Sequence, residues 1–193
     1  FGSDSVRALI VNTETGENVG QGVACYPRWK AGLYQHPEYS IFRQHPLDYL
    51  ESLEKCITTA LAELTEEQKD YVIGIGVDTT GSTPVPVDKN GIPLALLDEF
   101  AENENAMFFL WKDHAAAAEA DEINKLFRNN SENDYTKYQG DYSAEWYWAK
   151  ILYAVRHDEA IRQAAYTWEE HCDWMTGILC GETRPEKIYH SAC

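Results

Sequence analysis

The first half of the chain carries Tyr71-Val72-Ile73-Gly74-Ile75-Gly76-Val77, a continuous apolar run bounded by turn residues. Such a run predicts a strand buried on both faces of a sheet. The polar stretch 78–83, Asp-Thr-Thr-Gly-Ser-Thr, follows at once and is expected to form a loop at the carboxyl end of that strand. Residues 85–87 continue extended to a predicted hairpin turn at 88–91. Ligands of open α/β sheets bind beyond the carboxyl ends of strands, so the 78–83 loop is a candidate binding segment.

The sequence before this run predicts three further elements. Residues 6–11 and 18–26 are apolar runs separated by a turn sequence, which predicts an antiparallel hairpin. Residues 27–45 are rich in proline, histidine and aromatic residues and are expected to form a long loop. An apolar residue recurs every three or four positions over residues 50–64, so an amphipathic helix is predicted there. Pro46 suits the first turn of that helix.

The second half of the chain is expected to be mostly helical. One helix is predicted through residues 115–127, with Asp113 or His114 as its cap, and another begins at Ser143. Residues 167–170, Thr-Trp-Glu-Glu, fit a capping box that opens a last helix. The order of strands, helix, strand and helical tail predicts an α/β domain with a mixed sheet flanked by helices.

The composition is that of an acidic globular protein. The chain has 193 residues, with 16 Lys and Arg against 32 Asp and Glu, and a formal net charge of −16. A nucleic-acid binder needs a basic surface, so nucleic acids and anionic membranes are not expected as partners. No apolar run approaches the roughly 18 residues that a membrane span requires. The five cysteines are scattered without a CxxC pair, which favours free thiols and a cytoplasmic location.

The N-terminal stretch 1–7, Phe-Gly-Ser-Asp-Ser-Val-Arg, is a candidate anion site. A glycine followed by small hydroxyl residues lets several backbone N–H groups approach a phosphate, because no bulky side chain blocks them. Arg7 could add a positive charge. Taken alone, the stretch also fits a frayed polar terminus.

Two further segments could bind a polyol. The hydroxyl groups and glycine of the 78–83 loop suit a sugar, although an ordinary polar turn has the same composition. Trp111 offers an apolar face on which a sugar can stack, and Asp113 accepts hydroxyl protons. His114 could act as a base beside Asp113, but a helix-cap role is favoured for both residues. The glycines of 74–78 resemble part of a dinucleotide fingerprint but lie inside the predicted strand, so that interpretation fails.

In this order the segments resemble those of the FGGY carbohydrate kinases, a family with the actin-like ATPase, or ribonuclease H-like, fold. Residues 1–7 resemble the family's phosphate loop, Asp-x-Gly-Thr-x-x-x-Arg, whose Asp would precede Phe1. Residues 74–94 follow its second hairpin, and residues 111–113 match its Trp-x-Asp. The resemblance covers essentially the whole chain. It implies that residues 1–193 are the N-terminal, sugar-binding lobe, truncated at both ends and without the C-terminal ATP-binding lobe.

The resemblance also implies roles for particular residues. The residues expected to contact the phosphates of ATP are Gly2, Ser3, Asp4 and Arg7, with Arg7 near the γ-phosphate. The residues expected to bind the sugar are Gly81, Ser82, Thr83, Trp111 and Asp113. The catalytic base of the family is an Asp that is expected beyond residue 193, so no catalytic residue and no metal ligand is assigned within the chain. The chain alone is therefore expected to be folded but inactive.

The implied reaction is phosphorylation of the terminal hydroxyl of a ketopentose by ATP and Mg²⁺, carried out mainly by positioning and electrostatics. The strings 80–84, 106–114, 143–150 and 172–174 look specifically like the branch that phosphorylates the 5-hydroxyl of L-ribulose in arabinose catabolism. The alternatives are a kinase for D-ribulose or xylulose and a non-catalytic actin-like module that binds sugar. A homodimer is a further expectation.

Overall fold

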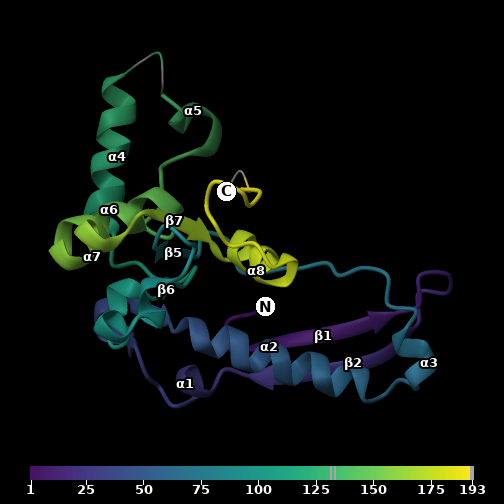
Figure 1. The fold of residues 1–193 in the computed structure, drawn as a ribbon. Coiled ribbons are helices and arrows are strands. Elements are labelled where there is room, and N and C mark those ends of the chain that lie inside the picture. The colour runs from purple at the N-terminus through teal and green to yellow at the C-terminus, as the bar shows by residue number, and fades with distance from the viewer. Residues whose placement is uncertain (131, 133, 192–193) are drawn as a thin grey trace.

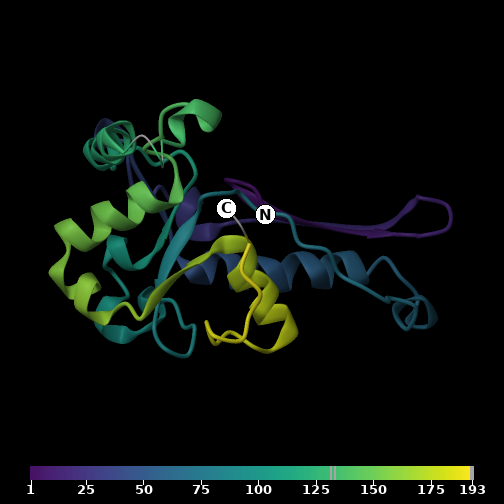
Figure 2. The same cartoon turned by 90° about the horizontal axis from the view of Figure 1, so that it is seen from above.

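A computed structural model describes residues 1–130, 132 and 134–191 of the chain (Figure 1). The predicted hairpin is confirmed: β1 (Ser5–Val11) pairs antiparallel with β2 (Asn18–Cys25). The predicted amphipathic helix is also confirmed as α2 (Pro46–Leu61), which packs along both strands. Gly22 makes this packing possible, because a Cβ at that position would lie 2.0 Å from the carbonyl oxygen of Cys56. Figure 2 shows the hairpin and α2 extending together, away from α6 and α7.

Two small sheets form the other half of the β structure. The first has the order β3 (Gln35–His36), β4 (Ile41–Gln44) and β6 (Phe108–Phe109), all antiparallel. The second pairs β5 (Pro84–Val87) with β7 (Thr167–Glu170), also antiparallel. The strands β3 and β4 lie within the segment that was expected to be a loop, and they form because β6 supplies a distant partner.

Helices make up most of the second half, as predicted. The longer ones are α4 (Ala117–Asn129), α6 (Tyr147–His157) and α8 (His171–Cys180). The short ones are α1 (Pro27–Lys30), α3 (Glu66–Lys69), α5 (Thr136–Gln139) and α7 (Glu159–Ala164), with 3-10 turns at Pro37–Tyr39, Leu94–Leu96, Asp98–Phe100 and Glu104–Ala106. None of the helices in the described residues is long and apolar enough to cross a membrane.

One main core joins the hairpin to the helical half. Its buried members come from β1, β2, α1, α2, β5, β6 and α8 and from residues beside them, and its largest fully buried side chains are Tyr26, Tyr49, Phe108 and Trp174. Their rings meet edge-on or tilted: Tyr49 lies 5.0 Å from Phe108, which lies 5.3 Å from Trp174. Such aromatic contacts add to the burial of apolar area. The core therefore fixes β5 and β6, the elements next to the candidate binding loops, relative to the N-terminus.

The predicted strand at residues 71–77 is wrong. This segment is an extended chain without a partner strand, and Ile73 and Ile75 are 87% and 69% exposed. It leads from α3 towards β5 (Figure 1) and only Val77 packs against the main core. An apolar run becomes a buried strand only where neighbouring strands satisfy its backbone N–H and C=O groups. No described strand does so here.

Three predicted helix starts are also wrong. Residues 167–170 form β7, and the last helix begins at His171. The helix α4 begins at Ala117 without a side-chain cap, and α6 begins at Tyr147 rather than at Ser143. For residues 167–170, pairing with β5 prevails over the local capping pattern.

Candidate functional site

The N-terminal segment lies beside the loop that follows residues 71–77. The backbone nitrogen of Phe1 lies 2.6 Å from the carbonyl oxygen of Asp78. The Gly2 amide donates to the carbonyl of Ser5 over 2.9 Å, so this amide is already used in a turn. Residues 1–5 therefore form an ordered turn at the start of β1 and not a frayed end.

Ser3 and Asp4 are held by two tryptophans. The indole N–H of Trp111 donates to Ser3 Oγ over 2.8 Å, and that of Trp29 donates to Asp4 Oδ1 over 2.7 Å. The carbonyl of Ser3 also accepts from Gln44 Nε2 over 2.6 Å. The Ser3 contact joins the segment expected to bind phosphate to a residue expected to bind sugar, although the two are far apart in sequence.

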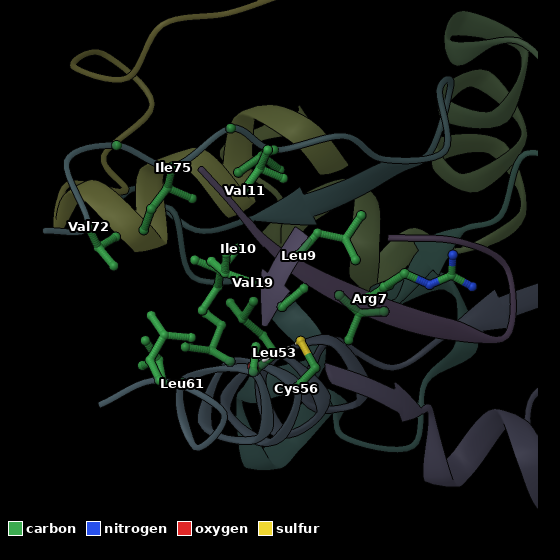
Figure 3. Close-up of a pocket in the computed structure, with 18 of the residues that line it drawn as sticks. Arg7, Leu9, Ile10, Val11, Val19, Leu53, Cys56, Leu61, Val72 and Ile75 are labelled. Carbon is green, nitrogen blue, oxygen red and sulfur yellow. Dashed lines mark hydrogen bonds between the residues drawn. The ribbon is translucent and has the colours of Figure 1, made fainter. Parts of the chain in front are cut away.

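Arg7 lies further along β1, opposite Val23, and is exposed. It makes no ion pair with any described residue, so its charge is free to meet an anion. Its neighbours line a groove of about 1510 Å³ between β1, α2 and residues 71–78. Figure 3 shows mainly apolar side chains along this groove, with Val11 of β1 near Ile75 and with Ile10 on the side of the strand that faces Leu61 of α2. The groove therefore does not suit a sugar, whose hydroxyl groups need polar partners.

The 78–83 loop has a fixed and partly strained shape. Ser82 has a φ of +48°, in the left-handed region that non-glycine residues seldom adopt. Thr83 is fully buried, its amide donates to Glu170 Oε1 over 2.6 Å, and its hydroxyl donates to the carbonyl of Gly81 over 3.1 Å. Gly81 is exposed and Ser82 is half-buried. In this structure Gly81 and Ser82 face solvent, whereas Thr83 anchors the loop.

Trp111 and Asp113 have different environments, although they are two residues apart. Trp111 is 43% exposed, so part of its ring is free for a ligand. Asp113 is fully buried, forms an ion pair with Arg43, and accepts from the amide of Phe42 over 2.7 Å. The guanidinium of Arg43 also lies over the ring of Phe109, 3.5 Å from its centroid. Through these contacts with Arg43 and Phe42, Asp113 fixes the Trp111 turn to β4.

Sequence reasoning missed two buried charged residues of this region. Lys150 donates to the carbonyls of Ser82 and Leu110, and Glu170 binds the Thr83 amide. Burial lowers the pKa of the Lys150 ammonium to about 7 and raises the pKa of the Glu170 carboxyl. The only sequence sign of Lys150 is its place inside the string 143–150. Its partners are carbonyls of distant segments, which no local pattern indicates.

The described residues contain no group of three or more His, Cys, Asp or Glu side chains that could hold a metal ion. The carboxylates nearest the N-terminal turn do not gather: Asp4 is engaged by Trp29, and Asp78 contributes only its carbonyl to the contact with Phe1. These residues do not by themselves fit a Mg²⁺ ion, and none is assigned as a ligand.

Comparison with curated proteins finds ribulokinases. The ribulokinase of Vibrio parahaemolyticus is 51% identical over 194 residues, which cover 100% of this chain and 34% of that protein. Those of Shouchella clausii and Halalkalibacterium halodurans are 34% and 32% identical, over 94% and 100% of this chain. The chain spans about a third of the length of these relatives. No family model matches it.

Comparison with solved structures finds the same fold in two xylulose kinases. Those from Brucella ovis and Bifidobacterium adolescentis each give a TM-score of 0.66 at 16% identity. They cover 92% and 97% of this chain, and the chain covers 32% and 36% of theirs. Identity this low supports the fold alone. Along its whole length the chain is thus similar in sequence to about a third of these ribulokinases, and it shares its α/β fold with the two xylulose kinases.

Proposed function

We propose that the chain is the N-terminal, sugar-binding part of an ATP-dependent ribulokinase, which transfers a phosphoryl group from ATP to the 5-hydroxyl of L-ribulose. The main support is the 51% identity to a ribulokinase over the whole chain. The placement of Ser3 against Trp111 adds to it, because a kinase must bring its phosphate and sugar sites together.

The sugar would lie against the exposed part of Trp111, beside Gly81 and Ser82. An indole ring gives the apolar face of a sugar a surface on which to stack, and backbone groups of an exposed loop can bind its hydroxyls. Thr83 and Asp113 are fully buried and would act from beneath, by holding the loop and the Trp111 turn. Their roles are therefore support rather than direct contact.

The phosphates of ATP would lie at the N-terminal turn. The Ser3 hydroxyl and the amides of Ser3 and Asp4 would be the donors there, since the Gly2 amide is used in the turn. Arg7, further along β1, forms no ion pair with a described residue and would add a positive charge. Asp4 is held by Trp29 and would fix the shape of the turn. When bound with ATP, Mg²⁺ would offset the charge of the phosphates. With a net charge of −16, the protein must hold ATP through such local groups rather than through its overall potential.

We further propose a cytoplasmic protein whose partners are a ketopentose and ATP, assembled as a homodimer. The four described cysteines, Cys25, Cys56, Cys172 and Cys180, are free thiols, which suits a reducing compartment. Cys193 lies outside the described residues.

The test is a kinase assay on the full-length protein that contains this chain. ADP formation would be followed with L-ribulose, D-ribulose, L-xylulose and D-xylulose at equal concentrations. We expect the highest kcat/KM with L-ribulose, and no turnover by the 193-residue chain alone. A preference for a xylulose over both ribuloses would contradict the substrate, and turnover by the chain alone would contradict its assignment as one lobe.

A further inference from the structure

Lys150 is a charged side chain in a place where charge is costly. It belongs to α6, it is fully buried, and its neighbours along the helix, Ala149 and Ala154, are buried as well. A lysine is almost never fully buried unless partners compensate the loss of hydration. The partners of Lys150 therefore indicate what the residue does.

These partners are two backbone carbonyls from the two candidate sugar segments. The Nζ atom donates to the carbonyl of Ser82 and, over 3.0 Å, to the carbonyl of Leu110, which directly precedes Trp111. One ammonium group thereby bridges the Gly81–Ser82 loop and the Trp111 turn. No carboxylate among the described residues forms an ion pair with it, so its contacts are with the loops themselves.

Glu170 anchors the same loop at Thr83, the residue that follows Ser82. Its Oε1 accepts from the amide of Thr83 over 2.6 Å, so the carbonyl of Ser82 and the amide of Thr83 are both fixed by buried charged groups. These two groups belong to one peptide, which follows Ser82, a residue held in the left-handed backbone region that non-glycine residues seldom adopt. A strained conformation persists only where its surroundings determine it, and the two anchors do so here.

We propose that Lys150 is a positioning residue of the sugar site: through the carbonyls of Ser82 and Leu110 it sets the distance and orientation between the Gly81–Ser82 loop and Trp111. This role rests on the proposed function. The side chain lies beneath the loop and does not touch the sugar. Its effect is to present two sugar-binding segments in one fixed arrangement before the sugar arrives, which lowers the ordering cost of binding.

The test is Lys150→Met in the full-length enzyme, because methionine keeps a similar length and loses the N–H donors. We expect KM for L-ribulose to rise tenfold or more, while KM for ATP stays within twofold of the wild type. Lys150→Gln, which keeps N–H donors without the charge, should recover part of the loss. Lys125→Met, an exposed position on α4, is the matched control and should change neither constant.

Two kinds of result would overturn the role. One is an unchanged KM for L-ribulose, or equal rises in both KM values, in a folded Lys150→Met variant. The other is loss of folding in both the Met and the Gln variants, which would assign Lys150 to stability alone. If the wild type phosphorylates no ketopentose, the proposed function fails separately. Hydrogen exchange of residues 80–84 then still tests the anchor, since Lys150→Met should speed exchange there and Lys125→Met should not.

Discussion

Two apolar segments that follow one another in the chain have opposite environments. Residues 71–77 are exposed, with Ile73 at 87%, whereas all four residues of β5 are buried. The difference lies in their partners. β5 pairs with β7, with Val85 opposite Glu169, while no described strand pairs with residues 71–77. Apolar sequence alone does not create a buried strand; a partner must satisfy the backbone as well.

The same contrast separates an open groove on one side of the molecule from a filled core on the other. The groove between β1 and residues 71–78 is large and apolar, and it lies under an unpaired strand edge. Around β5 the space is filled by aromatic rings and by the buried anchors Lys150 and Glu170. The candidate sugar loop is attached to the filled region. The candidate binding segments therefore lie where the packing is dense.

The largest expected effect is on the packing beneath β5. Trp174 is 1% exposed, packs on Phe108, and donates from its indole N–H to the carbonyl of Gly91 over 3.2 Å. Trp174→Ala should lower the free energy of unfolding by about 4 kcal/mol, through lost burial and an open cavity. Urea unfolding of the chain measures it. Trp148→Ala is the control, since Trp148 is 62% exposed. If both variants lost the same free energy of unfolding, the buried position of Trp174 would not matter more than the exposed position of Trp148.

A smaller effect is expected from Glu169, the residue of β7 opposite Val85. Its side chain is fully buried and finds no hydrogen-bond partner among the described residues, and burial raises its carboxyl pKa from 4.5 to about 8, with Asp173 and Asp88 acting in the same direction. Between those two pH values the folded chain binds the proton that the unfolded chain has released, so stability falls as pH rises.

Glu169→Gln removes this dependence, because the amide does not titrate. Relative to that variant, the wild type should lose on the order of 2 kcal/mol of unfolding free energy between pH 5 and pH 8. Urea unfolding of both proteins at each pH gives the difference. A difference that is constant with pH would show that the carboxyl is hydrated, and that the β5–β7 pair is less closed than described.

The smallest expected effect is in residues 71–77. Ile73→Ala should change the free energy of unfolding by less than about 0.5 kcal/mol, because exposed side chains contribute little. Val85→Ala in β5 is the matched control and should cost several times more. If Ile73→Ala instead costs about 2 kcal/mol or more, the run is buried in solution, and pairing with the free edge of β1 would be the structure to look for.

Local sequence patterns predicted the elements whose partners are near in the chain. The β1–β2 hairpin is closed by its own turn, and α2 follows from its apolar period. Residues 167–170 were assigned wrongly because Thr-Trp-Glu-Glu fits both a capping box and a strand. The choice between them depends on β5, a distant partner that the local pattern does not contain.

The candidate site divides in the same way. Gly81, Ser82, Thr83, Trp111 and Asp113 were singled out from residue type and from the resemblance to FGGY kinases. Arg43, the ion-pair partner of Asp113, and Lys150 were not, because their contacts join segments that only the folded chain brings together. Lysine side chains are normally exposed, so the residue type alone does not predict that Lys150 is buried.

The close approach of Gly22 to α2 bears on the register of the hairpin. A hairpin shifted by one residue would bring Gln21 or Val23 against the carbonyl of Cys56, where a Cβ has no room. The helix can therefore dock only on the correctly registered hairpin. The packing of α2 on Gly22 therefore favours the observed register of the hairpin over a slipped one.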